Sequence, residues 1–201
     1  VGNPTEAESE ESRSVREALE KSRDFQEAIT TYPKKLTFER MVIGHLVRYP
    51  DDYVGAIKTL PENLQMMFVH AYQSYLFNRI LSERIRRELP LNQPLVGDIL
   101  LPADRLGLPN HDRHIPVTHS NLDMAIKQVS DGKAFVSGVL YGSESGFSGG
   151  EMGELERKVV EAEGLQPQDF LIPQIPQVSS KGTRRELICK YKDLKVEMAG
   201  E

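Results

Sequence analysis

The first ninety residues carry their apolar side chains at the three- and four-residue spacing of amphipathic helices. This spacing predicts helices over 5–31, over 37–48, up to residue 60 and over 61–88. Tyr49-Pro50 and Pro90 end the second and the last of these, because proline disfavours a helical conformation in the residue before it. Four apolar residues of the second helix are expected to face inward, Phe38, Met41, Val42 and Leu46. We therefore predict an all-helical layer over 1–90.

The long helix is apolar around most of its circumference. At 100° per residue, four polar residues within 70–78 fall in one arc of about 140°, namely His70, Gln73, Ser74 and Asn78. A helix that is apolar nearly all round is usually buried. We expect this helix to be mostly buried, with Phe68, Tyr72, Tyr75 and Leu76 in the core. The polar arc then forms a satisfied hydrogen-bond network or lines a surface against another domain, since an unsatisfied buried polar group costs about 1–3 kcal/mol.

Strand signals begin after Pro94. Runs of β-branched and aromatic residues predict strands over 95–101, 115–119 and 134–141, with helices over 120–129 and 151–163. Alternation over 184–191 and 194–198 predicts a hairpin whose turn is Lys192-Asp193. The expected fold class is α+β, a helical layer followed by a small mixed β-sheet with helices.

The amino-acid composition indicates the cellular compartment and shows where charge gathers along the chain. Hydrophobic content of 39% and charged content of 27% are ordinary for a soluble protein, and no apolar run reaches the roughly 18 residues of a membrane helix. The single Cys189 excludes an internal disulfide and favours a reducing, cytoplasmic setting. We interpret it as a packed strand thiol. The net charge of −5 does not indicate nucleic-acid binding, but basic residues gather over 181–195 and at Arg79, Arg84, Arg86 and Arg87.

Two motifs resemble a phosphate-binding loop and a metal site, but their residues favour neither. The glycine- and serine-rich segment 142–150 stands between a strand and a helix, where phosphate-binding loops occur, but it lacks the Gly-Lys-Ser/Thr of a P-loop. We expect a packed turn or a surface that docks RNA. The second motif contains His111, Asp112, His114 and His119, and it straddles a loop and a strand. A solvated loop is favoured over the metal site of a hydrolase.

Three blocks of sequence resemble the TruD family of tRNA pseudouridine synthases, especially its archaeal branch. The first block is His70–Asn78 (HAYQSYLFN), with Phe68 before it and Arg79 after it. The second is Gly142-Ser143-Glu144 followed by 148–156 (SGGEMGELE), and the third is Phe170 followed by 180–185 (SKGTRR). The resemblance spans roughly 36–198. It implies that residues 1–178 form the TruD-specific insertion domain, helical over 1–90 and α/β over 91–178. It also implies that 179–201 begin the returning catalytic domain.

The same resemblance implies an activity. A parent enzyme would isomerise a uridine in the D-arm region of tRNA to pseudouridine, without metal or organic cofactor, in the cytoplasm. Its catalytic aspartate would stand in a Gly-x-Lys-Asp motif, which these 201 residues lack, so no catalytic residue is expected here. We interpret Asp193 of the single Lys-Asp pair as a turn residue. The chain starts at Val1 and stops within a strand-like run, as expected of a piece of a larger protein.

The expected partners are therefore tRNA, the rest of the parent chain and no membrane. Charge and family position together single out six RNA-binding candidates: Arg184, Arg185, Lys181, Arg79, Arg86 and Arg87. The alternative for Arg184 and Arg185 is a structural ion pair with a carboxylate such as Glu186 or Glu197. The alternative function is a non-catalytic module that binds RNA or another protein.

Overall fold

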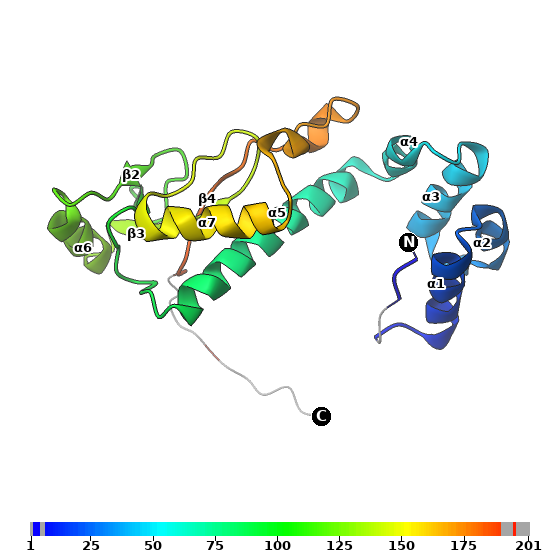
Figure 1. Ribbon diagram of the computed structural model, residues 1–201, viewed down its shortest axis with the longest axis horizontal. Helices are drawn as coiled ribbons and strands as arrows, with labels where there is room; N and C mark the ends of the chain where they lie inside the picture. The colour runs from blue at the N-terminus through cyan, green and yellow to red at the C-terminus, as the bar shows by residue number, and fades with distance from the viewer. Residues whose placement is uncertain (1, 5–6, 190–194, 196–201) are drawn as a thin grey trace. The chain divides into compact units, whose positions relative to one another are not determined.

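The computed structural model describes residues 2–4, 7–189 and 195 (Figure 1). The chain divides into two compact units. Unit 1 contains Val1–Val69 and Ile172–Val178, and unit 2 contains His70–Leu171 and Ser179–Glu201. Helices precede strands along the chain, as predicted, and the two units divide inside the long helix.

Unit 1 is helical. It contains α1 (Glu10–Ser22), α2 (Phe25–Thr31), α3 (Thr37–Arg48), α4 (Tyr53–Lys58), the start of α5 (Glu62–Arg86) and the short 3₁₀ helix η2 (Pro176–Val178). The single helix expected over 5–31 is in fact two helices. Arg23 takes a left-handed conformation (φ 54°) and ends α1, and the Asp24 side chain accepts a hydrogen bond from the Glu27 N–H to begin α2.

The core of unit 1 consists of two apolar clusters. One contains Leu19, Ala28, Tyr32 and Ile43, and the other contains Val42, Leu46, Ala56 and Leu60. The prediction for the helix over 37–48 is half right. Val42 and Leu46 are buried, whereas Phe38 is 47% exposed and Met41 is 37% exposed.

The long helix α5 is only partly buried. Leu76 has no exposed surface and Gln73 is buried, but Phe68, Tyr72 and Tyr75 are 46%, 37% and 47% exposed. The prediction of a mostly buried helix was therefore wrong for its aromatic residues. It failed because the helix is apolar around most of its circumference, whereas only the face with Leu76, Phe77 and Ile80 packs inward.

Unit 2 holds a four-stranded sheet in the order β2-β1-β3-β4, built from β1 (Ile99–Pro102), β2 (Ile115–Pro116), β3 (Ala134–Leu140) and β4 (Thr183–Glu186). Every pairing is antiparallel, so the α+β class is confirmed while the mixed sheet is not. Unit 2 also contains α6 (Leu122–Ser130), α7 (Gly150–Ala162) and the 3₁₀ helix η1 (Pro167–Phe170). Figure 1 shows α6 beside β2 and β3. The strand expected over 194–198 and its Lys192-Asp193 turn lie outside the described residues.

The two faces of this sheet have different character. On one face Leu100, Val136 and Ala134 pack against Ala125 of α6. Side chains alternate along a strand, so Ser137 and Val139 of β3 project from the opposite face, together with Arg184, the partner of Val139 in the β3–β4 register. Arg185 pairs with Gly138 and belongs to the first face. Arg184 and Arg185, which are neighbours in one motif, therefore lie on opposite faces of the sheet.

We predict that Leu76→Ala lowers the free energy of unfolding by about 2–5 kcal/mol, because it leaves a cavity in a fully buried site. Urea denaturation measures the change. Ser82→Ala, at an exposed position of the same helix, is the control and should stay within about 0.5 kcal/mol. A loss below that value for Leu76→Ala would mean that α5 is not anchored by this side chain.

Candidate nucleic-acid interface

The three sequence blocks meet in unit 2, and Gln73 of α5 joins the first block to the other two. Its side-chain amide donates to the carbonyl oxygen of Tyr141 at 2.7 Å and to the hydroxyl oxygen of Ser180 at 2.9 Å. Tyr141 directly precedes the glycine-rich segment, and Ser180 begins the run 180–185 of the third block. One member of the polar arc therefore has the satisfied structural role that we predicted, while His70 and Asn78 are exposed.

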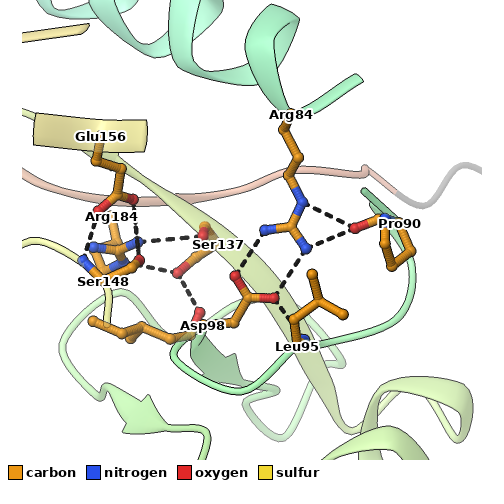
Figure 2. Close-up of polar contacts among 9 residues, drawn as sticks. Arg84, Pro90, Leu95, Asp98, Ser137, Ser148, Glu156 and Arg184 are labelled. Carbon is orange, nitrogen blue, oxygen red and sulfur yellow. Dashed lines mark hydrogen bonds and ion pairs between the residues drawn. The ribbon is translucent and has the colours of Figure 1, made fainter. Parts of the chain in front are cut away.

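Arg184 of β4 and Glu156 of α7 form a buried ion pair at the centre of this junction (Figure 2). Their side chains are 3% and 0% exposed, with 2.9 Å between Arg184 Nη2 and Glu156 Oε1. Ser148 donates to the same carboxylate through its backbone N–H at 2.6 Å and through its hydroxyl at 3.1 Å. Arg184 Nε also donates to Ser137 Oγ on β3 at 2.9 Å. The pair thus ties α7, the loop and two strands together.

The glycine-rich segment packs tightly against the third block. A Cβ on Gly142 would lie 2.2 Å from the backbone nitrogen of Gly182, which leaves room only for glycine. The N–H groups of Ser143 and Glu144 donate to the carbonyl oxygens of Ser180 and Lys181, both at 2.9 Å. The loop is a packed strand-to-helix turn, as one of our two alternatives proposed, and its N–H groups at Ser143, Glu144 and Ser148 donate to oxygen atoms of the protein itself.

A second buried ion pair fixes the end of α5 beside β1 (Figure 2). Arg84 donates to both oxygens of Asp98, at 2.7 and 2.9 Å, and neither side chain has exposed surface. Arg84 also donates to the carbonyl oxygen of Pro90, and Asp98 accepts from the N–H of Leu95. Arg84 therefore does not belong to the exposed basic cluster in which the sequence placed it.

Tyr141 follows β3 and directly precedes the glycine-rich segment 142–150. Its ring stacks on Phe147 at 5.4 Å and meets Phe170 edge-on at 5.5 Å. Burial raises the pKa of the Tyr141 phenol above its usual value, and the negative charge of Asp169 adds to the effect. The phenol is therefore neutral at physiological pH, and the residue acts as a packing anchor.

The structure corrects the prediction for Arg184. A phosphate cannot reach a guanidinium that is buried and already bonded to Glu156, Ser137, Ser148 and the carbonyl oxygen of Gly146. The structural alternative was the better one, although the partner is Glu156 rather than Glu186 or Glu197. Sequence spacing could not have revealed this partner, because the pair spans 28 residues and forms only when β4 and α7 pack together.

Four other RNA candidates have acidic partners. Arg79 pairs with Glu163, Arg86 with Glu83, Arg87 with Glu151 and Lys181 with Glu144. The Arg79 pair is partly buried, and the other three are more exposed. Exposed pairs contribute only about 0–1 kcal/mol, so a phosphate can compete with the carboxylate for these cations. Their role in RNA binding stays a prediction.

Arg185 differs from the other five candidates in its ion pairing. Its side chain is exposed, and its guanidinium lies 5.7 Å from the centre of the Phe77 ring on α5. No carboxylate pairs with it among the described residues. Phe77 lies under Gly138, where an added Cβ would be 3.0 Å from the ring, so the ring that supports Arg185 is held firmly.

Other candidate chemistry does not assemble in the described part of the chain. No group of three or more His, Cys, Asp or Glu side chains there could hold a metal ion. His111 instead makes a contact of 2.9 Å between its Nδ1 and the carbonyl oxygen of Arg184. Cys189 is exposed and follows β4, so the packed strand thiol was wrong. Asp193 lies outside the described residues.

The family model described as tRNA pseudouridine synthase D (TruD) matches residues 1–201 of this chain. The chain belongs to the TruD family. A relative from Methanococcoides burtonii, named "Probable tRNA pseudouridine synthase D", is 41% identical over 90% of the chain and 41% of its own length. A relative of the same name from Natronomonas pharaonis is 42% identical over 98% of the chain and 45% of its own length.

A TruD crystal structure from Methanosarcina mazei superimposes with a TM-score of 0.88 at 38% identity, covering 92% of this chain and 42% of that one. The TruD resemblance and the α+β class are thereby confirmed. The chain spans less than half the length of these TruD relatives. Within the described residues, no helix of this TruD chain is long and apolar enough to cross a membrane.

Proposed function

We propose that this chain is the RNA-contacting part of a TruD pseudouridine synthase that isomerises a uridine in the D-arm region of tRNA in the cytoplasm. In this proposal residues 1–178 are the insertion domain and 179–201 begin the returning catalytic domain. The catalytic aspartate belongs to a Gly-x-Lys-Asp motif outside these residues. The chain shapes the cleft that receives the RNA, and the rest of the enzyme supplies the chemistry.

The observation that carries this proposal is the placement of Arg184 and Arg185. The first is buried and joins the second and third TruD blocks through Ser148 and Glu156, and the second is exposed beside Phe77. Arginine binds phosphate through a planar set of donors, and a supporting ring limits the number of orientations that it can take. The buried network thus fixes the strand that presents a cation to solvent.

We expect the 201-residue chain by itself to form no pseudouridine, because isomerisation needs a carboxylate at the flipped nucleotide and the family's Gly-x-Lys-Asp motif is absent. Incubation with an unmodified tRNA transcript, followed by carbodiimide mapping of pseudouridine, measures this. Robust conversion would mean that a carboxylate of this chain is the nucleophile. It would refute the proposal that the catalytic aspartate lies outside these residues.

Arg185→Ala should weaken tRNA binding and make the dependence of log affinity on log salt shallower by about one, since one phosphate contact is lost. Fluorescence anisotropy across a salt series measures both effects. Arg157→Ala is a matched control, because this exposed arginine of α7 also lies over a phenylalanine ring, Phe147, at 5.8 Å. Equal losses of tRNA affinity for the two variants would mean that net charge alone causes the effect, and would contradict a specific role for Arg185.

A further inference from the structure

The exposed face of α3 in unit 1 carries aromatic and basic side chains. At 100° per residue, four of its residues fall within an arc of about 80°, namely Phe38, Met41, His45 and Arg48, and Tyr49 follows as the C-cap residue. Phe38 is 47% exposed and Tyr49 is 58% exposed, although large aromatic side chains are usually well covered. The core side of the helix, with Val42, Ile43 and Leu46, is fully occupied. The aromatic face is therefore additional to what the fold of unit 1 requires.

A groove runs beside this face. It has a volume of about 300 Å³ and is lined by Arg40, Met41, Gly44, His45, Arg48, Tyr49 and Thr59. This volume is at the lower end of the range for ligand pockets, about 300–1,000 Å³. The His45 and Tyr49 rings lie 5.1 Å apart, and His45 Nε2 is 2.9 Å from an oxygen of Asp52. The imidazole is thus held in place against the exposed ring.

The charge of this region differs from that of the first two helices. Residues 1–27 hold eight acidic and four basic side chains, whereas residues 33–60 hold five Lys and Arg against three Asp and Glu. Two of those three acids are engaged, Glu39 with Arg16 and Asp52 with His45 and the N–H of Gly55. Arg48 is exposed and has no ion-pair partner among the described residues. The groove therefore offers a cation next to an open ring.

We propose that this groove binds an unpaired nucleotide of RNA, with the base stacked on Tyr49 and a backbone phosphate on Arg48. Unpaired bases are recognised by stacking on aromatic side chains, with cations along the backbone. A protein partner would favour a larger apolar area without the basic excess. The inference rests on the proposed function, since it adds a second RNA contact in unit 1 to the one at Arg185 in unit 2.

The test is fluorescence anisotropy of the 201-residue chain with a short labelled oligouridine and with an RNA duplex of the same length. Tyr49→Ala should weaken binding of the single strand about five- to a hundredfold and leave duplex binding unchanged. Tyr49→Phe keeps the ring and should bind like the wild type. Arg48→Ala should also make the salt dependence for the single strand shallower by about 0.7. Because both side chains are exposed, the melting temperature should not move.

Arg13→Ala is the matched control, an exposed arginine of α1 in the same unit, and it should bind like the wild type. Wild-type affinity in Tyr49→Ala, or an equal loss for single strand and duplex, would overturn the stacking site. If Tyr49→Ala binds the single strand like the wild type while Arg185→Ala still weakens tRNA binding, only the α3 site is refuted. If the wild-type chain binds neither RNA, the proposed function is refuted together with it.

Discussion

Arg184→Ala is expected to lower the free energy of unfolding by about 3–5 kcal/mol, because it strands the Glu156 carboxylate in a site with no exposed surface. The variant also removes the donors to Ser137 Oγ and Ser148 Oγ, which connect β3 and the loop to β4. Urea denaturation followed by circular dichroism measures the loss. The neighbouring Arg185→Ala is the control, since it gives up only an exposed cation–π contact worth about 0.5–1 kcal/mol.

A second variant separates the unpaired charge from the loss of contacts. Replacing both members of a buried pair by apolar residues of similar size is often close to neutral. Arg184→Met combined with Glu156→Met should therefore recover part of the stability that Arg184→Ala loses. If Arg184→Ala lost less than about 1 kcal/mol, as a surface arginine does, the burial of this side chain would be contradicted.

Asp98→Ala should have a comparable effect, about 3–5 kcal/mol, at the second buried ion pair. Asp98 accepts two hydrogen bonds from Arg84 and one from the N–H of Leu95. Its removal leaves the fully buried guanidinium of Arg84 with the carbonyl oxygen of Pro90 alone. Glu83→Ala, which opens the exposed pair with Arg86 on the same helix, is the control and should change stability by less than about 1 kcal/mol. Equal effects of Asp98→Ala and Glu83→Ala would refute the buried pair.

Sequence periodicity predicted most of the elements because local spacing reports local structure. The helix over 37–48 matches α3 to the residue, and the predicted strand over 134–141 contains β3. The break between α1 and α2 was missed, because a left-handed Arg23 has no strong sequence signal. Asp24, a good N-cap residue within the predicted helix, was the available clue.

The candidate site was less predictable, since it depends on contacts between residues far apart in the chain. Charge alone gave Arg184 and Arg185 the same role, whereas the β3–β4 register places them on opposite faces. Alternation along a strand implies such a split, which was a signal available in the sequence. Glu156 lies in the second motif block, but an acidic residue on an amphipathic helix usually faces water, so its burial could not be inferred.

Photocrosslinking tests the central claim most directly, namely that this TruD segment contacts tRNA through the strand that carries Arg185. The 201-residue chain is irradiated with a tRNA transcript containing 4-thiouridine, and crosslinked peptides are identified by mass spectrometry. We expect crosslinks in the peptide that contains Gly182–Glu186, and we expect Arg185→Ala to reduce them while Arg157→Ala does not. Crosslinks confined to the acidic helices α1 and α2, with none near Arg185, would contradict the account.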